Sequence, residues 1–199
     1  MQLKIFFAFI SLLLSLVLFV PYYIGIWRGE TKPHLLTWLT WFVLTALGFL
    51  LSFKSGGGAG SFTFALQSML CLLIVIFAFW KKEKNIVYFD WLVFACIVVI
   101  VFFYILTKNV LLSVVFAATV DCLGYLPTFR KSYTEPYQEP PLTYFLAFLS
   151  WSFSVFALQK YSTTTLFYPL ALVLINGTFV IFLIVRRSVI KKNNFVLKA

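Results

Sequence analysis

Seven long apolar runs constrain this chain more than any other feature of its sequence. Each is about 20 residues long, which is the length a helix needs to cross the hydrocarbon core of a bilayer. Short polar or glycine-rich connections separate the runs, which cover residues 5–27, 35–53, 61–80, 86–106, 109–129, 142–159 and 165–185. The pattern predicts an all-α, multi-pass membrane protein with seven transmembrane helices and no soluble domain.

The composition supports lipid as the solvent for most of this chain. Hydrophobic residues make up 62% and charged residues 11%, against roughly 45–50% and about 25% in soluble domains. A compact soluble domain of this size leaves about a third of its unfolded-chain surface facing water, so it could not hide so many apolar side chains. A soluble enzyme, a secreted disulfide scaffold and a disordered chain are excluded. Three cysteines, Cys71, Cys96 and Cys122, lie within apolar runs without metal-type spacing, and we expect small buried residues there.

The positive charge sits in short clusters between the apolar runs. The net charge is +10, but there is no basic stripe and no nucleic-acid fold motif, so no nucleic-acid partner is expected. If seven helices alternate in direction, one side receives four basic residues and the other twelve; the four are Lys4, Lys54, Lys108 and Lys160. Because cytoplasmic loops carry the excess of Lys and Arg, this split predicts an integral protein of the plasma or inner membrane. Its N-terminus would lie outside and its C-terminus in the cytoplasm.

Two parts of the chain resemble each other at an offset of 106 residues. The matched pairs are Pro21 with Pro127, Thr37 with Thr143, Trp38 with Tyr144, Phe42 with Phe148, and Gly48 with Ser154. The repeat predicts a first triple-helix unit at residues 1–85, a linker helix at 86–108, a second triple-helix unit at 109–187 and a basic tail at 188–199. If two units of three helices were joined directly, the second would be inverted in the membrane. The linker helix adds one crossing, so that both units have the same orientation.

Two triple-helix units joined by a linker helix, each with a proline near the end of its first helix, resemble the SWEET and PQ-loop transporters. In the second unit Pro127 is followed by Arg130, Lys131 and Ser132, and the first keeps Pro21 with Arg28. The glutamine of the family signature is absent, since Tyr22 and Thr128 follow the two prolines. The resemblance implies a transporter or facilitator of a small polar solute, with polar residues of the third and seventh helices facing it.

Three polar side chains lie deep within the apolar runs. Asp121 is the one carboxylate well inside a run, and because a charge at mid-membrane costs about 2.5–3.5 kcal/mol it should face the protein interior or a watery cavity. It is either a proton-coupling or substrate-binding group, or a neutral acid hydrogen-bonded to another helix. Asn176 lies halfway along the seventh run and Gln67 near the matching place in the third. The resemblance implies that both line the substrate site; interhelical hydrogen bonding is the alternative.

Two stripes of small and hydroxyl residues each contain a tryptophan at helical spacing. Thr37 and Trp41 belong to the stripe of the second run, and Thr143 and Trp151 to that of the sixth. Small residues allow close helix packing, whereas a large ring among them either fills a gap or forms the floor of a cavity. An aromatic floor beside Asn176 would suit a sugar, a nucleoside or an amino acid.

Pro21 and Pro127 each remove a backbone hydrogen bond and should kink their helices near the cytoplasmic side. The matched positions favour a pair of hinges that gate a central site, although proline is also commoner in membrane helices than in soluble ones. Without a catalytic constellation or ligand cluster, we expect no enzyme, metal or cofactor. The alternative to transport is a receptor or scaffold that uses its cytoplasmic loops around residues 130–139. Either function is compatible with a homo-oligomer. A central cavity would favour transport, and a filled core the receptor.

Overall fold

Helices make up nearly all of the structure. The computed structural model describes residues 2–28, 35–80, 88–134, 136–137 and 139–190, and contains no strand within those ranges. The elements are α1 (Gln2–Arg28), α2 (Leu35–Lys54), the short 3-10 helix η1 (Gly58–Ser61), α3 (Phe62–Trp80), α4 (Tyr88–Thr107), α5 (Val110–Gly124), α6 (Leu126–Thr134), α7 (Pro141–Ala157) and α8 (Thr163–Val189). The predicted all-α class is therefore confirmed.

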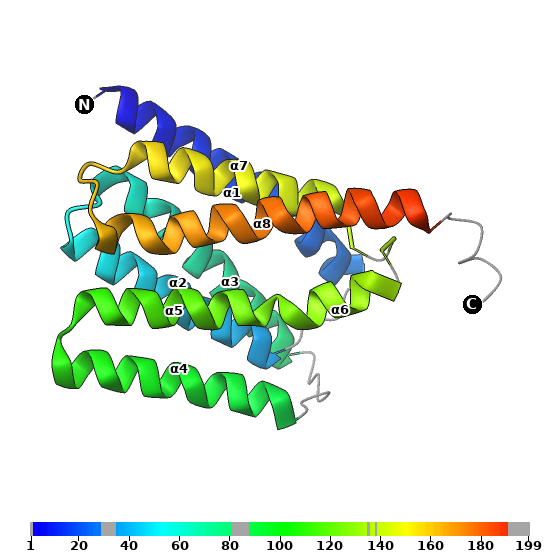
Figure 1. Ribbon diagram of the computed structural model, residues 1–199, viewed down its shortest axis with the longest axis horizontal. Coiled ribbons are helices and arrows are strands. Elements are labelled where there is room, and N and C mark those ends of the chain that lie inside the picture. The colour runs from blue at the N-terminus through cyan, green and yellow to red at the C-terminus, as the bar shows by residue number, and fades with distance from the viewer. Residues whose placement is uncertain (1, 29–34, 81–87, 135, 138, 191–199) are drawn as a thin grey trace.

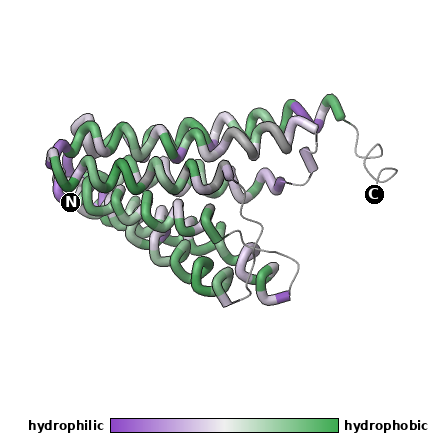
Figure 2. Tube along the Cα trace, turned by 90° about the horizontal axis from the view of Figure 1, so that it is seen from below, coloured by the Kyte–Doolittle hydropathy of each residue, from purple (hydrophilic) through white to green (hydrophobic). Residues whose placement is uncertain are grey.

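Three helical segments of the described chain are long and apolar enough to cross a membrane. They are Gln2–Arg28, Gly58–Trp80 and Thr163–Val189, and shorter apolar helices cover Trp38–Lys54, Phe94–Thr107, Val110–Gly124 and Pro141–Ala157. Hydrophobic residues run along the helices, and hydrophilic ones gather toward the two ends of the molecule (Figure 2). Large apolar side chains such as Phe6, Phe9 and Leu13 of α1 are exposed on the outside. This surface is compatible with an integral membrane protein.

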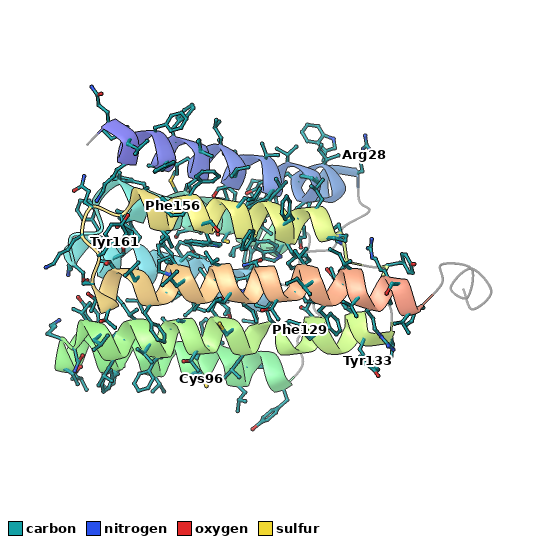
Figure 3. The ribbon with its side chains drawn as sticks, turned by 45° about the horizontal axis from the view of Figure 1, so that its top comes forward. Arg28, Cys96, Phe129, Tyr133, Phe156 and Tyr161 are labelled. Carbon is teal, nitrogen blue, oxygen red and sulfur yellow. The ribbon has the colours of Figure 1, made fainter. Side chains whose placement is uncertain are left out.

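The cysteines differ in their surroundings. Cys71 is buried, as expected, and Cys122 is partly buried. Cys96 is exposed and lies on the outer face of α4 (Figure 3), so the expectation of a buried residue is wrong there. An apolar surface that faces lipid accepts a thiol as readily as a core does, because neither offers water to the sulfur.

The basic residues separate to the two ends of the molecule. The N-terminus and the α2–α3, α4–α5 and α7–α8 connections share one end, and α6 and the C-terminus lie at the other (Figure 1). At the first end Lys4 Nζ donates to the Gln159 carbonyl at 3.0 Å, and Lys54 and Lys108 both lie over the Tyr104 ring. Arg28 lies at the opposite end from Tyr161 (Figure 3). We call these the lysine end and the α6 end.

The packing order of the helices has an internal symmetry. In the described chain α3 packs on both α1 and α2, whose backbones do not pack on each other, and α8 packs in the same way on α5 and α7. Across the middle α1 packs on α7 and α2 on α5, while α3 meets α7 and α8 meets α2. Exchanging α1 with α5, α2 with α7 and α3 with α8 leaves this set of neighbours unchanged. α4 packs on α2 and α5 (Figure 1).

The predicted fifth helix, residues 109–129, is divided. α5 ends at Gly124, Tyr125 forms a turn whose N–H bonds the Cys122 carbonyl at 3.1 Å, and α6 begins at Leu126. Pro127 is the second residue of α6, where its missing N–H removes no helical hydrogen bond. It therefore does not kink a continuous helix, whereas Pro21 does lie inside α1.

Two other boundaries also differ from the sequence prediction. α6 continues to Thr134, so the expected connection after Phe129 begins as a helix. α8 reaches Val189, which makes the first residues of the predicted tail at 188–199 helical. The rest of that tail from residue 191 lies outside the described residues.

The lysine end is closed by two connections that pack on each other. Gln159 N–H donates to the Gly57 carbonyl at 2.9 Å, and Ser154 Oγ donates to the Gly60 carbonyl at 2.8 Å. A Cβ at Gly60 would lie 2.6 Å from the Ser154 carbonyl oxygen and 2.7 Å from the Leu158 nitrogen. Only glycine allows the backbones to approach this closely. We call η1 and the preceding Gly56 and Gly57, packed on the α7–α8 connection, the glycine seal.

Buried hydroxyls join α1, α3 and α7 beside the seal. Ser11 Oγ lies 2.8 Å from Thr63 Oγ1 and donates to the Ser150 carbonyl at 2.7 Å. Ser150 Oγ lies 2.8 Å from Ser15 Oγ and donates back to the Ser11 carbonyl at 3.0 Å. Small side chains let α1 and α7 approach closely, and interhelical hydrogen bonds add to their packing in lipid.

Candidate functional site

A cavity of about 650 Å³ lies among α1, α2, α3, α5, α7 and α8. Its walls include six of the residues predicted to bind substrate: Trp41, Gln67, Asp121, Thr143, Trp151 and Asn176. Pro21, one of the two predicted hinges, lines it as well. Thr37 belongs to α2 and Pro127 to α6, but their side chains lie outside the described part of the chain.

Asp121 lies near the end of α5 and is only 5% exposed. Tyr168 Oη, from α8, donates to its Oδ2 at 2.8 Å, and Trp41, from α2, lines the same cavity. Among the described residues no Lys or Arg lines the cavity.

The amide side chains of Asn176 and Gln67 line the cavity and differ in how many hydrogen bonds they already make to the protein. Asn176 is 1% exposed, and its Nδ2 donates to the Leu172 carbonyl at 2.8 Å while its Oδ1 accepts from Tyr125 Oη at 3.1 Å. Gln67 Nε2 donates to Ser15 Oγ at 3.3 Å. Its Oε1 accepts no hydrogen bond from the residues that the structure describes, so it is available to a ligand.

Aromatic rings form much of the wall between the polar groups. Trp38 and Trp41 meet edge to face with their centroids 4.9 Å apart, and Trp38 Nε1 donates to Tyr22 Oη at 2.9 Å. Trp151 is buried, and its centroid lies 4.5 Å from that of Phe64. These contacts fix the rings, so the aromatic faces are held before any ligand arrives.

The cavity extends from the middle of the molecule toward the α6 end. Its walls come from the C-terminal half of α1, the N-terminal halves of α2 and α7, and the central parts of α3 and α8. Glu139 and Pro140, just before α7, also line it, and Tyr144 Oη donates to Glu139 Oε2 at 2.9 Å. Neither the glycine seal nor the α7–α8 connection contributes to the walls.

Several residues of the cavity were not singled out as site candidates from the sequence. They are Phe19, Tyr22, Trp38, Tyr125, Glu139 and Tyr144 on its walls, with Tyr168 behind Asp121. Trp38 and Tyr144 carried a usable signal, because they match at the repeat offset and lie one helical turn from Trp41 and Ala147. Comparison of the chain with protein-family models, characterised proteins and solved structures gives no match.

The arrangement can bind a solute but offers little chemistry to transform one. Its polar groups are the carboxyls of Asp121 and Glu139, two amides, two threonine hydroxyls, the Cys71 thiol, the indole N–H groups and the phenol hydroxyls. In the part of the chain that the structure describes, no group of three His, Cys, Asp or Glu side chains is placed to hold a metal ion. The cavity is a candidate binding site with aromatic walls.

Proposed function

We propose that this chain is a transporter or facilitator of a small polar solute. In this proposal it crosses the membrane seven times, with its N-terminus outside and its C-terminus in the cytoplasm. It moves solute by alternating access between two three-helix repeats. The observation that carries the proposal is the polar and aromatic cavity among α1, α2, α3, α5, α7 and α8, whose walls reach toward the α6 end and do not include the glycine seal.

The seven crossings are supported by helix length and charge. α2 and α4 have 20 residues each and α7 has 17, within the range of about 17–25 that spans a bilayer. α5 has only 15 residues, so α6 completes that crossing. Lys4, Lys54 and Lys108 lie together at one end. This agrees with the predicted outer side, which receives four of the basic residues against twelve on the cytoplasmic side.

The two repeats are supported by the symmetric set of helix neighbours. α3 lies between α1 and α2 as α8 lies between α5 and α7, which is the relation expected of two copies of one triple-helix unit. An axis along the membrane normal would exchange the α1–α7 contact with the α5–α2 contact. α4, packed on α2 and α5, is then the linker.

Alternating access is supported by the unequal ends of the cavity. Its walls reach Glu139 and Pro140 toward the α6 end and do not include the glycine seal, so with the lysine end outside the proposed state is closed outside by the seal and open toward the cytoplasm. The opposite state requires the seal to separate and the α6 end to close. Pro21 in α1 and the break at Tyr125 before Pro127 are places where each repeat can bend, so they are the proposed hinges.

A receptor or scaffold that does not transport is the rival from another class. That function needs no solute site and is satisfied by a core filled with side chains. A cavity of about 650 Å³ falls in the range of roughly 300–1,000 Å³ typical of small-molecule sites. It therefore favours transport over the rival.

Transport is tested with purified protein in proteoliposomes, using counterflow of labelled sugars, nucleosides, amino acids and amines. We expect at least one solute to move and Asn176→Ala to weaken its binding, since Asn176 lines the cavity. Ser152→Ala is the matched control, because Ser152 bonds only the Phe148 carbonyl of its own helix. Protein that moves none of these solutes, together with an Asn176→Ala variant that binds every ligand as the unaltered protein does, would contradict the proposal.

A further inference from the structure

We infer that the solute of this cavity is a small organic cation, such as an amine or a quaternary ammonium compound. This inference rests on the proposed function and narrows the substrate class from small polar solutes in general. Three features of the cavity carry it: a buried acidic group without a described countercharge, free hydrogen-bond acceptors and aromatic walls.

The cavity wall carries a buried acidic group. Asp121 lines the cavity and is 5% exposed, and no Lys or Arg is among the described lining residues. Asp121 also makes no ion pair with any side chain that the structure describes. The hydrogen bond from Tyr168 to its Oδ2 supplies no positive charge. A cationic ligand would supply the missing countercharge in a site that excludes most water, where the attraction is stronger than in solution.

The cavity keeps free hydrogen-bond acceptors beside its amide donors. A carboxylate accepts about four hydrogen bonds, and Tyr168 supplies one to Asp121. Gln67 Oε1 accepts none from the described residues. The oxygen of Asn176 is already engaged by Tyr125. A ligand that presents N–H or O–H donors fits the free acceptors on Asp121 and Gln67.

Aromatic rings share the cavity walls with the acidic group. Trp41 meets Trp38 edge to face, and Tyr125 follows Asp121 by four residues, one helical turn along the chain. Tyr144 lies beside Tyr125, and the two ring centroids are 6.4 Å apart. The face of an aromatic ring attracts a cation, with Trp the strongest, by about 0.5–2 kcal/mol per desolvated contact. A neutral sugar needs aromatic walls but no buried acid. Aromatic rings together with a carboxylate therefore favour a cation.

The test compares three probes of the same shape and different charge: choline, the neutral 3,3-dimethyl-1-butanol and the anion 3,3-dimethylbutanoate. Binding is read from the fluorescence of Trp38, Trp41 and Trp151, which line the cavity. We expect choline to half-saturate at a concentration at least tenfold lower than either other probe. Asp121→Asn should reduce this preference to less than threefold, and Asp121→Glu should keep part of it.

Cys96→Ser is the control variant, because Cys96 lies on the outer face of α4 (Figure 3); its choline preference should equal that of the unaltered protein. The three-probe comparison on unaltered protein decides the inference even where Asp121→Asn does not fold. Equal affinity for the three probes, tighter binding of either other probe, or no choline response would overturn it.

Transport measured on the same preparation separates this inference from the proposed function. Choline preference without movement of choline or any other solute supports the cation site and contradicts transport. Movement of glucose or uridine without any choline preference supports transport and overturns the cation inference.

Discussion

At the scale of single residues, Gly60 limits how tightly the lysine end can close. A Cβ added at Gly60 would lie 2.6 Å from the Ser154 carbonyl oxygen and 2.7 Å from the Leu158 nitrogen. Both neighbours are backbone atoms, one in α7 and one at its C-terminal cap, so they cannot swing aside as the end of a flexible side chain does. One methyl group therefore separates a closed seal from a strained one.

Gly60→Ala should destabilise the protein. Overpacking of this kind costs about 1–3 kcal/mol, which corresponds to a loss of roughly 2–12 °C in the midpoint of thermal unfolding for a chain of this size. The measurement is thermal unfolding in detergent. Gly124→Ala is the control, because nothing lies within 4 Å of its added Cβ; its midpoint should be unchanged or slightly higher. Equal midpoints for the two variants would show that the seal has room to spare.

The site was predictable from the sequence where a polar group interrupts an apolar run. Asp121, Gln67 and Asn176 stand out because burying their polar atoms in lipid is costly, so they point inward. Tyr168 and Tyr125 could not be found in this way, since a tyrosine is equally at home at the membrane interface, in the core or on a cavity wall. Their roles depend on which helices pack together, and hydropathy contains no information on that.

At the scale of helices, the length of an apolar run predicts the boundaries of α2 and α3 correctly but misses the turn between α5 and α6. Apolar length defines α2 and α3 to within a residue of the predicted runs. It does not detect the turn at Tyr125, because Leu123, Leu126 and Phe129 keep the run apolar on both sides. The turn lies two residues before Pro127, whose local effect on the backbone a hydropathy window averages away.

Substitution of Pro21 or Pro127 should change the rate of transport more than the affinity for the ligand. Pro21→Ala and Pro127→Ala each restore a backbone N–H, which straightens α1 or lets α5 continue into α6. If these are the hinges, we expect the initial rate of transport in proteoliposomes to fall on the order of tenfold, or about 1.4 kcal/mol in the barrier, with ligand affinity within twofold.

Pro141→Ala is the matched control for these hinge variants, because Pro141 is the first residue of α7, where a missing N–H costs nothing. Its transport rate should stay at the level of the unaltered protein. Hinge variants that weaken binding and leave the rate unchanged would assign the prolines to the site walls instead.

At the scale of the whole molecule, the two ends should lie on opposite sides of the membrane. In a protein whose native cysteines are replaced by alanine, we expect a membrane-impermeant maleimide to label Gln2→Cys and Gln159→Cys on intact cells. Ser188→Cys should react only after the cells are permeabilised. Gln2 and Gln159 lie at the lysine end, and Ser188 belongs to the last turn of α8. Labelling of Gln2→Cys and Ser188→Cys from the same side would require an even number of crossings and would contradict the parallel repeats.

The rocking mechanism makes a further demand on the molecule as a whole, because opening at the lysine end must separate the glycine seal. Lys160 packs against Gly56 across that seal, so Ser55→Cys and Lys160→Cys place a thiol on each of the two connections. Joining them with a short bifunctional thiol reagent should abolish transport and leave ligand binding from the α6 end within twofold of the uncrosslinked value. The single Ser55→Cys variant treated with the same reagent should transport normally, since nothing then joins the connections. Full transport by the crosslinked protein would mean that the seal does not open, and solute would have to reach the cavity by another route.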